Sequence, residues 1–367
     1  MKHQKSRMAA AAAAAILFCA AISKPACAQG APEVSARSAI LIDAASGRVL
    51  FEKNADEESL IASTTKIMTG LLVCEAGDLE REVAVPEEAV GVEGSSLYLK
   101  AGERLTVREL LYGMLLHSGN DAALALAIVT AGSEEAFVRQ MNERAASLGL
   151  AHTHFSNPHG LDSEGNYATA RDLAKLCCAA MENESFCRAV STKTAQAAGR
   201  SLTNHNKLLW RVDGADGIKT GYTKKAGRIL AGSATQKGQR LICVTIAAPD
   251  DWRDQETLFS YGFSRFRLKT LVREGEAVGS VPVVGGRTQC ISLIAGGALA
   301  CPLAEGEEAE LILHAPQFVY APVVCGQAGW LEVKVDGKTC KTVPVFYAQA
   351  AEALPQRRGF WERLFGG

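Results

Sequence analysis

The chain of 367 residues carries 39 basic and 40 acidic side chains, a net charge of −1, and 48% of its residues are hydrophobic. Basic residues form no stripe, so the composition excludes a typical nucleic-acid-binding protein, and we expect no nucleic acid partner. The length exceeds the size at which a single hydrophobic core stops growing, and two domains are therefore expected.

The first 28 residues have the pattern of a secretory signal peptide. A basic head is followed by apolar residues 8–22, and Ala26-Cys27-Ala28 offers the small residues of a signal peptidase site. The apolar run is shorter than the roughly 20 residues that cross a bilayer. We expect cleavage after Ala28 and export, which leaves 35 basic and 40 acidic side chains in the mature protein.

The start of the mature chain predicts a hairpin followed by helices. Residues 38–56 alternate like two antiparallel strands joined at Ala45-Ser46-Gly47. A helix is expected to contain IASTTKIMTG, residues 61–70, and to stop near Gly77.

A second helix opens at a capping box formed by Thr106 and Glu109, and it ends at Ser118-Gly119-Asn120. Further helical segments are expected at 122–148 and 170–181.

The later part of the chain predicts antiparallel strands. Strands are expected at 217–221, 227–236 and 239–248, with an amphipathic helix at 252–266. From about residue 271 short strands follow, including a hairpin that turns at Asp336-Gly337. The fold class is therefore α+β: an antiparallel sheet with a helical cluster over residues 29–270, followed by a small all-β domain over 271–350.

Three short motifs point to nucleophilic catalysis. Ser63 and Lys66 lie three residues apart, a spacing that puts both on one face of a helix. A lysine held beside a serine away from water can lose its proton and activate the hydroxyl. Together with Ser118-Gly119-Asn120 and Lys219-Thr220-Gly221, the order is SxxK, SxN and KTG, the signature of penicillin-binding proteins and serine β-lactamases.

Longer stretches around the motifs strengthen the resemblance. The sequences at 94–127, 153–162 and 214–234 resemble the low-molecular-weight penicillin-binding proteins that act as serine-type D-alanyl-D-alanine carboxypeptidases. The similarity covers about residues 33–270, and the β-rich segment after it resembles that family's second domain. The resemblance implies the serine β-lactamase/penicillin-binding transpeptidase-like fold, a peptidoglycan stem peptide ending in D-Ala-D-Ala as substrate, and covalent inhibition by β-lactam antibiotics.

The family's catalytic roles fall on three residues of this chain. Ser63 is expected to attack the D-Ala-D-Ala carbonyl and form an acyl-enzyme, with Lys66 taking the Ser63 proton. Ser118 is expected to relay a proton to the departing D-alanine.

Five further residues are expected to bind the substrate. Asn120 hydrogen-bonds its backbone amide, Lys219 supplies positive potential, and Thr220 binds the terminal carboxylate. Gly221 leaves room for the substrate along the strand, and the Ser63 and Tyr222 N–H groups form the oxyanion hole.

Several other polar residues lie in or near the segments that resemble the family. His159 matches a family position near the active site but serves equally well as a structural residue of a turn, and His205 is expected to be structural. Asp162 and Asp172 are expected to act as local caps or hydrogen-bond partners. No acidic cluster joins the histidines, so no metal site and no cofactor are expected.

Three alternative functions remain. A class A β-lactamase carries S-D-N and a separate glutamate, whereas this chain has S-G-N and no matching glutamate segment. A peptidoglycan DD-endopeptidase would use the same motifs. An inactive penicillin-binding sensor is the third alternative, and the intact motif residues argue against it.

The C-terminal segment 351–367 is predicted to be an amphipathic tail on the membrane surface. Its last twelve residues hold three arginines and one glutamate, together with Phe360, Trp361, Leu364 and Phe365 in one stripe. Such a helix lies in the headgroup region of a bilayer. We therefore expect the protein at the outer face of the cytoplasmic membrane, in the cell wall space.

Overall fold

The computed structural model describes residues 30–355, so the predicted signal peptide and residues 356–367 lie outside the described part. Within that part, five strands form an antiparallel sheet in the order β2-β1-β11-β10-β9. The strands are β1 (Ser38–Asp43), β2 (Val49–Lys53), β9 (Ala215–Thr223), β10 (Gly227–Gln236) and β11 (Gln239–Ile246). The predicted α+β class and the predicted strands are confirmed.

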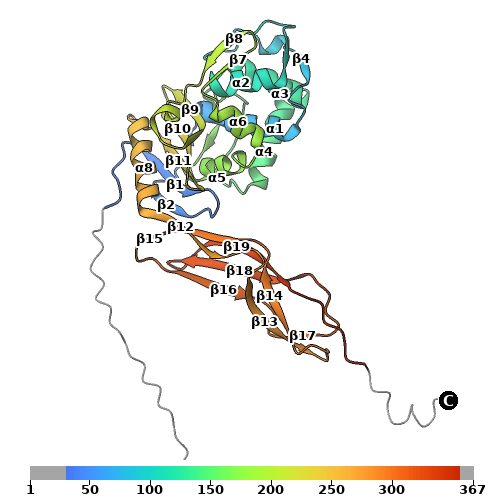
Figure 1. The fold of residues 1–367 in the computed structure, drawn as a ribbon. Coiled ribbons are helices and arrows are strands. Elements are labelled where there is room, and N and C mark those ends of the chain that lie inside the picture. Colours follow the sequence, from blue (N-terminus) through green and yellow to red (C-terminus); the bar gives the residue numbers. More distant parts are fainter. Residues whose placement is uncertain (1–29, 356–367) are drawn as a thin grey trace, which may run out of the picture. The chain divides into compact units, whose positions relative to one another are not determined.

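The central strands are buried on both faces, and the period of two along each strand divides their side chains between two cores. Ile40 and Ile42 of β1 belong to the core that the helical cluster covers. Ala39 and Leu41 belong to a second core, closed by α8 (Asp251–Arg265) on the opposite face (Figure 1). The sheet therefore lies between two helical layers. Strand β9, at one edge of the sheet, carries the KTG motif.

The helical cluster follows the predicted segments with three differences, one of which is an additional helix, α6 (Glu184–Ser191). It consists of α1 (Lys66–Ala76), α2 (Val107–Leu116), α3 (Asn120–Ala131), α4 (Glu134–Ser147), α5 (Ala170–Ala180) and α6 (Glu184–Ser191). The predicted stretch 122–148 breaks between α3 and α4, where Gly132 adopts φ +88° and Ser133 caps the next helix. The SxxK motif does not lie within one α-helix: Ser63 sits in a 3₁₀ turn, η1 (Ala62–Thr65), and α1 begins at Lys66.

Short elements connect the main ones. They are β3 (Ser59–Leu60), β4 (Glu82–Ala84), η2 (Glu87–Ala89), β5 (Arg104–Thr106), β6 (Tyr167–Ala168), β7 (Thr194–Ala197), β8 (Arg200–Thr203) and α7 (Leu208–Arg211). No helix within residues 30–355 is long and apolar enough to cross a membrane.

The C-terminal part is all-β, as predicted. Strand β12 (Phe266–Val272) pairs with β15 (Leu299–Ala304) and so continues across the predicted boundary at residue 270. Six other strands of the described chain form a sheet in the order β16-β18-β19-β14-β13-β17. They are β13 (Ala277–Val284), β14 (Cys290–Ala295), β16 (Ala309–His314), β17 (Val319–Tyr320), β18 (Gln327–Val335) and β19 (Lys338–Tyr347).

The segment that contains strands β12 to β19 is called the β domain below. It has an apolar core of its own. The turn between β18 and β19 falls at Asp336-Gly337, whose φ angles of 51° and 73° suit a tight hairpin turn, so this prediction is confirmed. Ala351 pairs with Val323 and Ala353 with Gly286, so the chain remains attached to the β domain beyond residue 351.

The capping box at the start of α2 is confirmed and gives a stability prediction. Thr106 Oγ1 accepts a hydrogen bond from the Glu109 N–H at 3.1 Å, and the Glu109 carboxylate accepts one from the Thr106 N–H at 2.8 Å. Thr106→Ala should lower the free energy of unfolding by about 1 kcal/mol, measured by urea denaturation. Thr106→Ser keeps the oxygen and should stay near wild type; equal losses in both variants would contradict the capping role.

Candidate active site

The SxxK and SxN motifs meet at the side chain of Lys66. Its Nζ lies 3.0 Å from Ser63 Oγ and 2.7 Å from Asn120 Oδ1. A third oxygen, the backbone carbonyl of His159, lies 2.6 Å away. The structure therefore brings Ser63 and Lys66 together, as their spacing predicts, and adds a contact with Asn120, which was expected only to bind the substrate.

Lys66 is fully buried, although a lysine is among the side chains least often found in a protein interior. Burial lowers its pKa well below the usual value of 10.5, and the nearby charge of Lys219 lowers the pKa further. The carboxylate of Asp121 opposes this shift. Asp121 is itself buried and accepts hydrogen bonds from the backbone N–H groups of Leu97 and Leu99. Sequence reasoning missed Asp121, which directly follows the SxN motif.

The loop at 157–161 holds the third oxygen in place. Asn157 Oδ1 accepts a hydrogen bond from the Gly160 N–H at 2.7 Å, and Thr69 Oγ1 donates one to the Pro158 carbonyl at 2.6 Å. Gly160 has φ +87°, and a Cβ at this position would lie 2.0 Å from the Ala62 carbonyl oxygen. Only glycine therefore allows this loop to approach the turn that carries Ser63.

The contribution of His159 to the site is its backbone carbonyl. Its ring is buried, and Nδ1 accepts a hydrogen bond from the Leu161 N–H at 3.2 Å. Burial is the main cause that lowers the pKa of the ring to about 4, so the imidazole is neutral at pH 7. A backbone acceptor has no side-chain signature, which is why the sequence pointed only to the ring.

The KTG strand runs against the turn that carries Ser63. Lys219 is buried, and burial lowers its pKa to about 7. A Cβ on Gly221 would lie 3.1 Å from the Ile61 carbonyl oxygen and 3.3 Å from the Ser63 nitrogen. Glycine at 221 thus permits close packing of the protein's own backbone as well as leaving room along the strand. Thr220 is half-buried, and the Tyr222 side chain is 66% exposed.

The turn between α2 and α3 presents Ser118. This serine is buried and adopts φ +67°, a left-handed conformation that is uncommon for a residue with a side chain. A Cβ on Gly119 would lie 2.9 Å from Asp121 Oδ1 and 3.2 Å from Leu97 Cγ. The aspartate that class A β-lactamases carry at this motif position would not fit here without movement of its neighbours.

The remaining candidates make local contacts. The N–H of His205 donates to the Leu116 carbonyl at 3.0 Å, and burial lowers the pKa of its ring to about 4. Asp162 accepts a hydrogen bond from Thr223 Oγ1 at 2.8 Å, and Asp172 accepts one from the His152 N–H at the same distance. No group of histidine, cysteine and acidic side chains within residues 30–355 is arranged to hold a metal ion.

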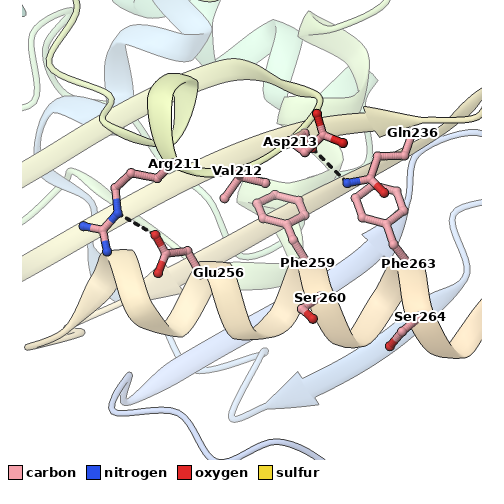
Figure 2. Close-up of a pocket in the computed structure, with 9 residues that line it drawn as sticks. All are labelled: Arg211, Val212, Asp213, Gln236, Glu256, Phe259, Ser260, Phe263 and Ser264. Atoms are coloured by element: carbon pink, nitrogen blue, oxygen red, sulfur yellow. Dashed lines mark hydrogen bonds and ion pairs between the residues drawn. The ribbon is translucent and has the colours of Figure 1, made fainter.

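A surface pocket lies away from these motifs, between α7 and α8. Figure 2 shows its rim, where Arg211 and Glu256 form an ion pair at 2.5 Å and Phe259 and Phe263 line the α8 side. None of the motif residues lines this pocket. The pocket is therefore separate from the cluster around Lys66.

Comparisons with known proteins agree with the family that the motifs indicate. A family model described as D-alanyl-D-alanine carboxypeptidase matches residues 25–250. The D-alanyl-D-alanine carboxypeptidase DacF of Bacillus subtilis is 35% identical over 89% of this chain and 87% of that protein. DacC of Escherichia coli is 35% identical over 91% of this chain and 88% of that protein. Penicillin-binding protein 5 from Haemophilus influenzae superposes with a TM-score of 0.78 and 28% identity, over 88% of this chain and 99% of that structure.

The fold and the arrangement of SxxK, SxN and KTG define a penicillin-binding serine hydrolase. Within this class, the chain belongs to the D-alanyl-D-alanine carboxypeptidase family. The resemblance drawn from the motifs is confirmed.

The two buried lysines predict a bell-shaped pH dependence. Acylation by a fluorescent penicillin should fall at low pH, as Lys66 gains a proton through its lowered pKa, and at high pH, as Lys219 loses its charge through a pKa of about 7. Lys219→Arg keeps a positive charge, because arginine stays protonated in proteins. In the Lys219→Arg variant, the pH at which the acylation rate falls on the alkaline side should rise by more than about one pH unit, even if the maximal rate changes. An alkaline limb at the wild-type position would show that Lys219 does not set it.

Proposed function

We propose that this protein is a serine-type D-alanyl-D-alanine carboxypeptidase that removes the terminal D-alanine of peptidoglycan stem pentapeptides through an acyl-enzyme on Ser63. The observation that carries the proposal is the buried amine of Lys66, 3.0 Å from the Ser63 hydroxyl. No observation favours an endopeptidase, a β-lactamase or an inactive sensor over this activity.

The acceptors around Lys66 suit a neutral amine that acts as a base. A neutral amine has two N–H groups and one lone pair, and both the Asn120 and His159 oxygens can only accept. If these oxygens take the two N–H groups, the lone pair faces Ser63. The Ser63 hydroxyl then transfers its proton to Nζ as Oγ bonds to the substrate carbonyl carbon.

Collapse of the tetrahedral intermediate breaks the bond to the terminal D-alanine. The proton taken by Lys66 passes to the departing nitrogen through the hydroxyl of Ser118, and D-alanine leaves with a free amine. Water then hydrolyses the Ser63 ester, which releases the shortened peptide and restores the hydroxyl. The 3.0 Å contact between Lys66 Nζ and Ser63 Oγ supports the first step, and the buried position of Ser118, two residues before Asn120, supports its role in the second.

Substrate binding is assigned to the KTG strand and the SxN turn. Thr220 holds the terminal carboxylate beside the charge of Lys219, and Asn120 binds a peptide amide of the substrate. The Ser63 and Tyr222 N–H groups form the oxyanion hole, a role supported by the close packing of β9 against η1 at Gly221.

The proposed location follows from both ends of the chain. Residues 1–28 act as a signal peptide, residues 29–265 form the catalytic domain, and residues 266–355, which include β12 and the paired Ala351 and Ala353, form the β domain. Residues 356–367 bind the outer face of the cytoplasmic membrane through their arginines and aromatic side chains.

The direct test of the activity uses diacetyl-Lys-D-Ala-D-Ala. The protein should release free D-alanine, and Ser63→Ala should reduce the rate by about 10³-fold or more because the nucleophile is lost. Mass spectrometry measures the product, and a fluorescent penicillin should label only Ser63.

Amidation of the last residue is the matched substrate control. The amide loses a charge-assisted contact, about twice as strong as a neutral one, so its turnover should fall far below that of the acid. Equal rates on acid and amide would contradict the carboxypeptidase assignment and favour an endopeptidase.

Deletion of residues 356–367 tests the proposed anchor. Co-sedimentation with vesicles that contain phosphatidylglycerol should drop several-fold, because the tail supplies three arginines and four large apolar side chains. Activity on the soluble peptide should not change. A truncated protein that sediments as well as the full chain would disprove the anchor.

A further inference from the structure

One edge of the β domain exposes an apolar cluster, hereafter the β17 patch. Strongly exposed apolar side chains gather here: Val284 (46%), Phe318 (49%), Tyr320 (69%) and Leu354 (56%), and Val324 (79%) follows Tyr320 four residues later in the chain. Scattered exposed apolar residues are ordinary on a protein surface, whereas a contiguous group indicates a contact.

The patch is contiguous because backbone pairing joins its three chain segments. Val284 lies opposite Tyr320 where β13 pairs with β17, and the rings of Phe318 and Tyr320 are 5.5 Å apart. The Leu354 N–H donates to the Gly285 carbonyl at 2.8 Å, which brings the end of the described chain to the same place. Figure 1 shows β17 beside β13 at this edge of the sheet, near the end of the described chain.

The surroundings of the patch are nearly uncharged. Segments 283–289, 315–326 and 348–355 hold 27 residues with two charged side chains, although 22% of the whole chain is charged. Those two, Arg287 and Glu352, form an ion pair with each other at 3.2 Å. The described segments therefore offer a neutral, aromatic surface.

The position of the chain end indicates what covers this surface. The chain leaves the patch at Pro355 and continues for twelve residues with three arginines and one glutamate. The patch offers these arginines no acidic partner except Glu352, which already pairs with Arg287. An anionic lipid surface meets the arginines and also accepts aromatic rings at the level of its headgroups.

We propose that the β17 patch is a second membrane contact, which inserts Phe318 and Tyr320 into the headgroup region beside the tail. This inference rests on the proposed membrane docking of residues 356–367. The new element is that the β domain itself contacts the lipid, in addition to the tail. Two adjoining contacts restrict how the domain can tilt on the membrane more than a single contact does.

The test compares two double variants in the full-length chain. Phe318→Ser with Tyr320→Ser should raise the apparent Kd for vesicles of phosphatidylglycerol and phosphatidylethanolamine about ten-fold, because two aromatic contacts are lost. The matched control, Leu311→Ser with Trp330→Ser, removes exposed apolar side chains from β16 and β18 at the opposite edge of the sheet. The control should stay within about two-fold of wild type. Thermal melts check that both variants fold.

The outcomes separate the patch from its alternatives. An unchanged Kd in the patch variant, or an equal loss in the control, would overturn the contact. Tighter binding by the patch variant would also overturn it, since it would mean that the patch holds the tail away from lipid. If the chain without residues 356–367 binds no vesicles, a ten-fold loss in the full-length variant still supports the patch. D-Alanine release from the soluble peptide, measured on the same samples, tests the catalytic proposal separately.

Discussion

The active site depends on a lysine amine that has no access to water. A buried ammonium costs several kcal/mol unless it is paired, so the protein must either neutralise Lys66 or surround it with acceptors. It does both: burial and Lys219 lower the pKa, and three oxygens from three chain segments contact Nζ. These oxygens belong to the turn before α1, the start of α3 and the loop at 157–161. The helical cluster and the sheet serve to bring these segments together.

Two glycines make this close assembly possible. Gly160 brings the loop at 157–161 against the Ala62 carbonyl, and Gly221 brings β9 against the nitrogen of Ser63. The turn that carries Ser63, the proposed nucleophile, therefore lies between two closely packed backbone segments. Such fixed positions are what electrostatic stabilisation of a transition state requires, because donors need not reorganise during the reaction.

Much of the fold could be predicted from local patterns. The β1–β2 hairpin, the capping box at Thr106 and the turn at Asp336-Gly337 each carry their signal within a few residues, and all three match the structure. The 3₁₀ turn at Ser63 could not be predicted, because the segments that pack against it, β9 and the loop at 157–161, are far away in the sequence. The role of the His159 carbonyl could not be predicted either. It lies 93 residues from Lys66 in the sequence, and any residue type can supply a backbone carbonyl.

The central claim is that Lys66 is a neutral amine in the resting enzyme. Nitrogen-15 and carbon-13 NMR of the lysine side chains, with Lys66 assigned through Lys66→Arg, measures this directly. The account predicts the chemical shifts of a neutral amine at pH 7, with protonation only at lower pH. Shifts of an ammonium group at pH 7 in the free enzyme would contradict the assignment of Lys66 as the base that activates Ser63.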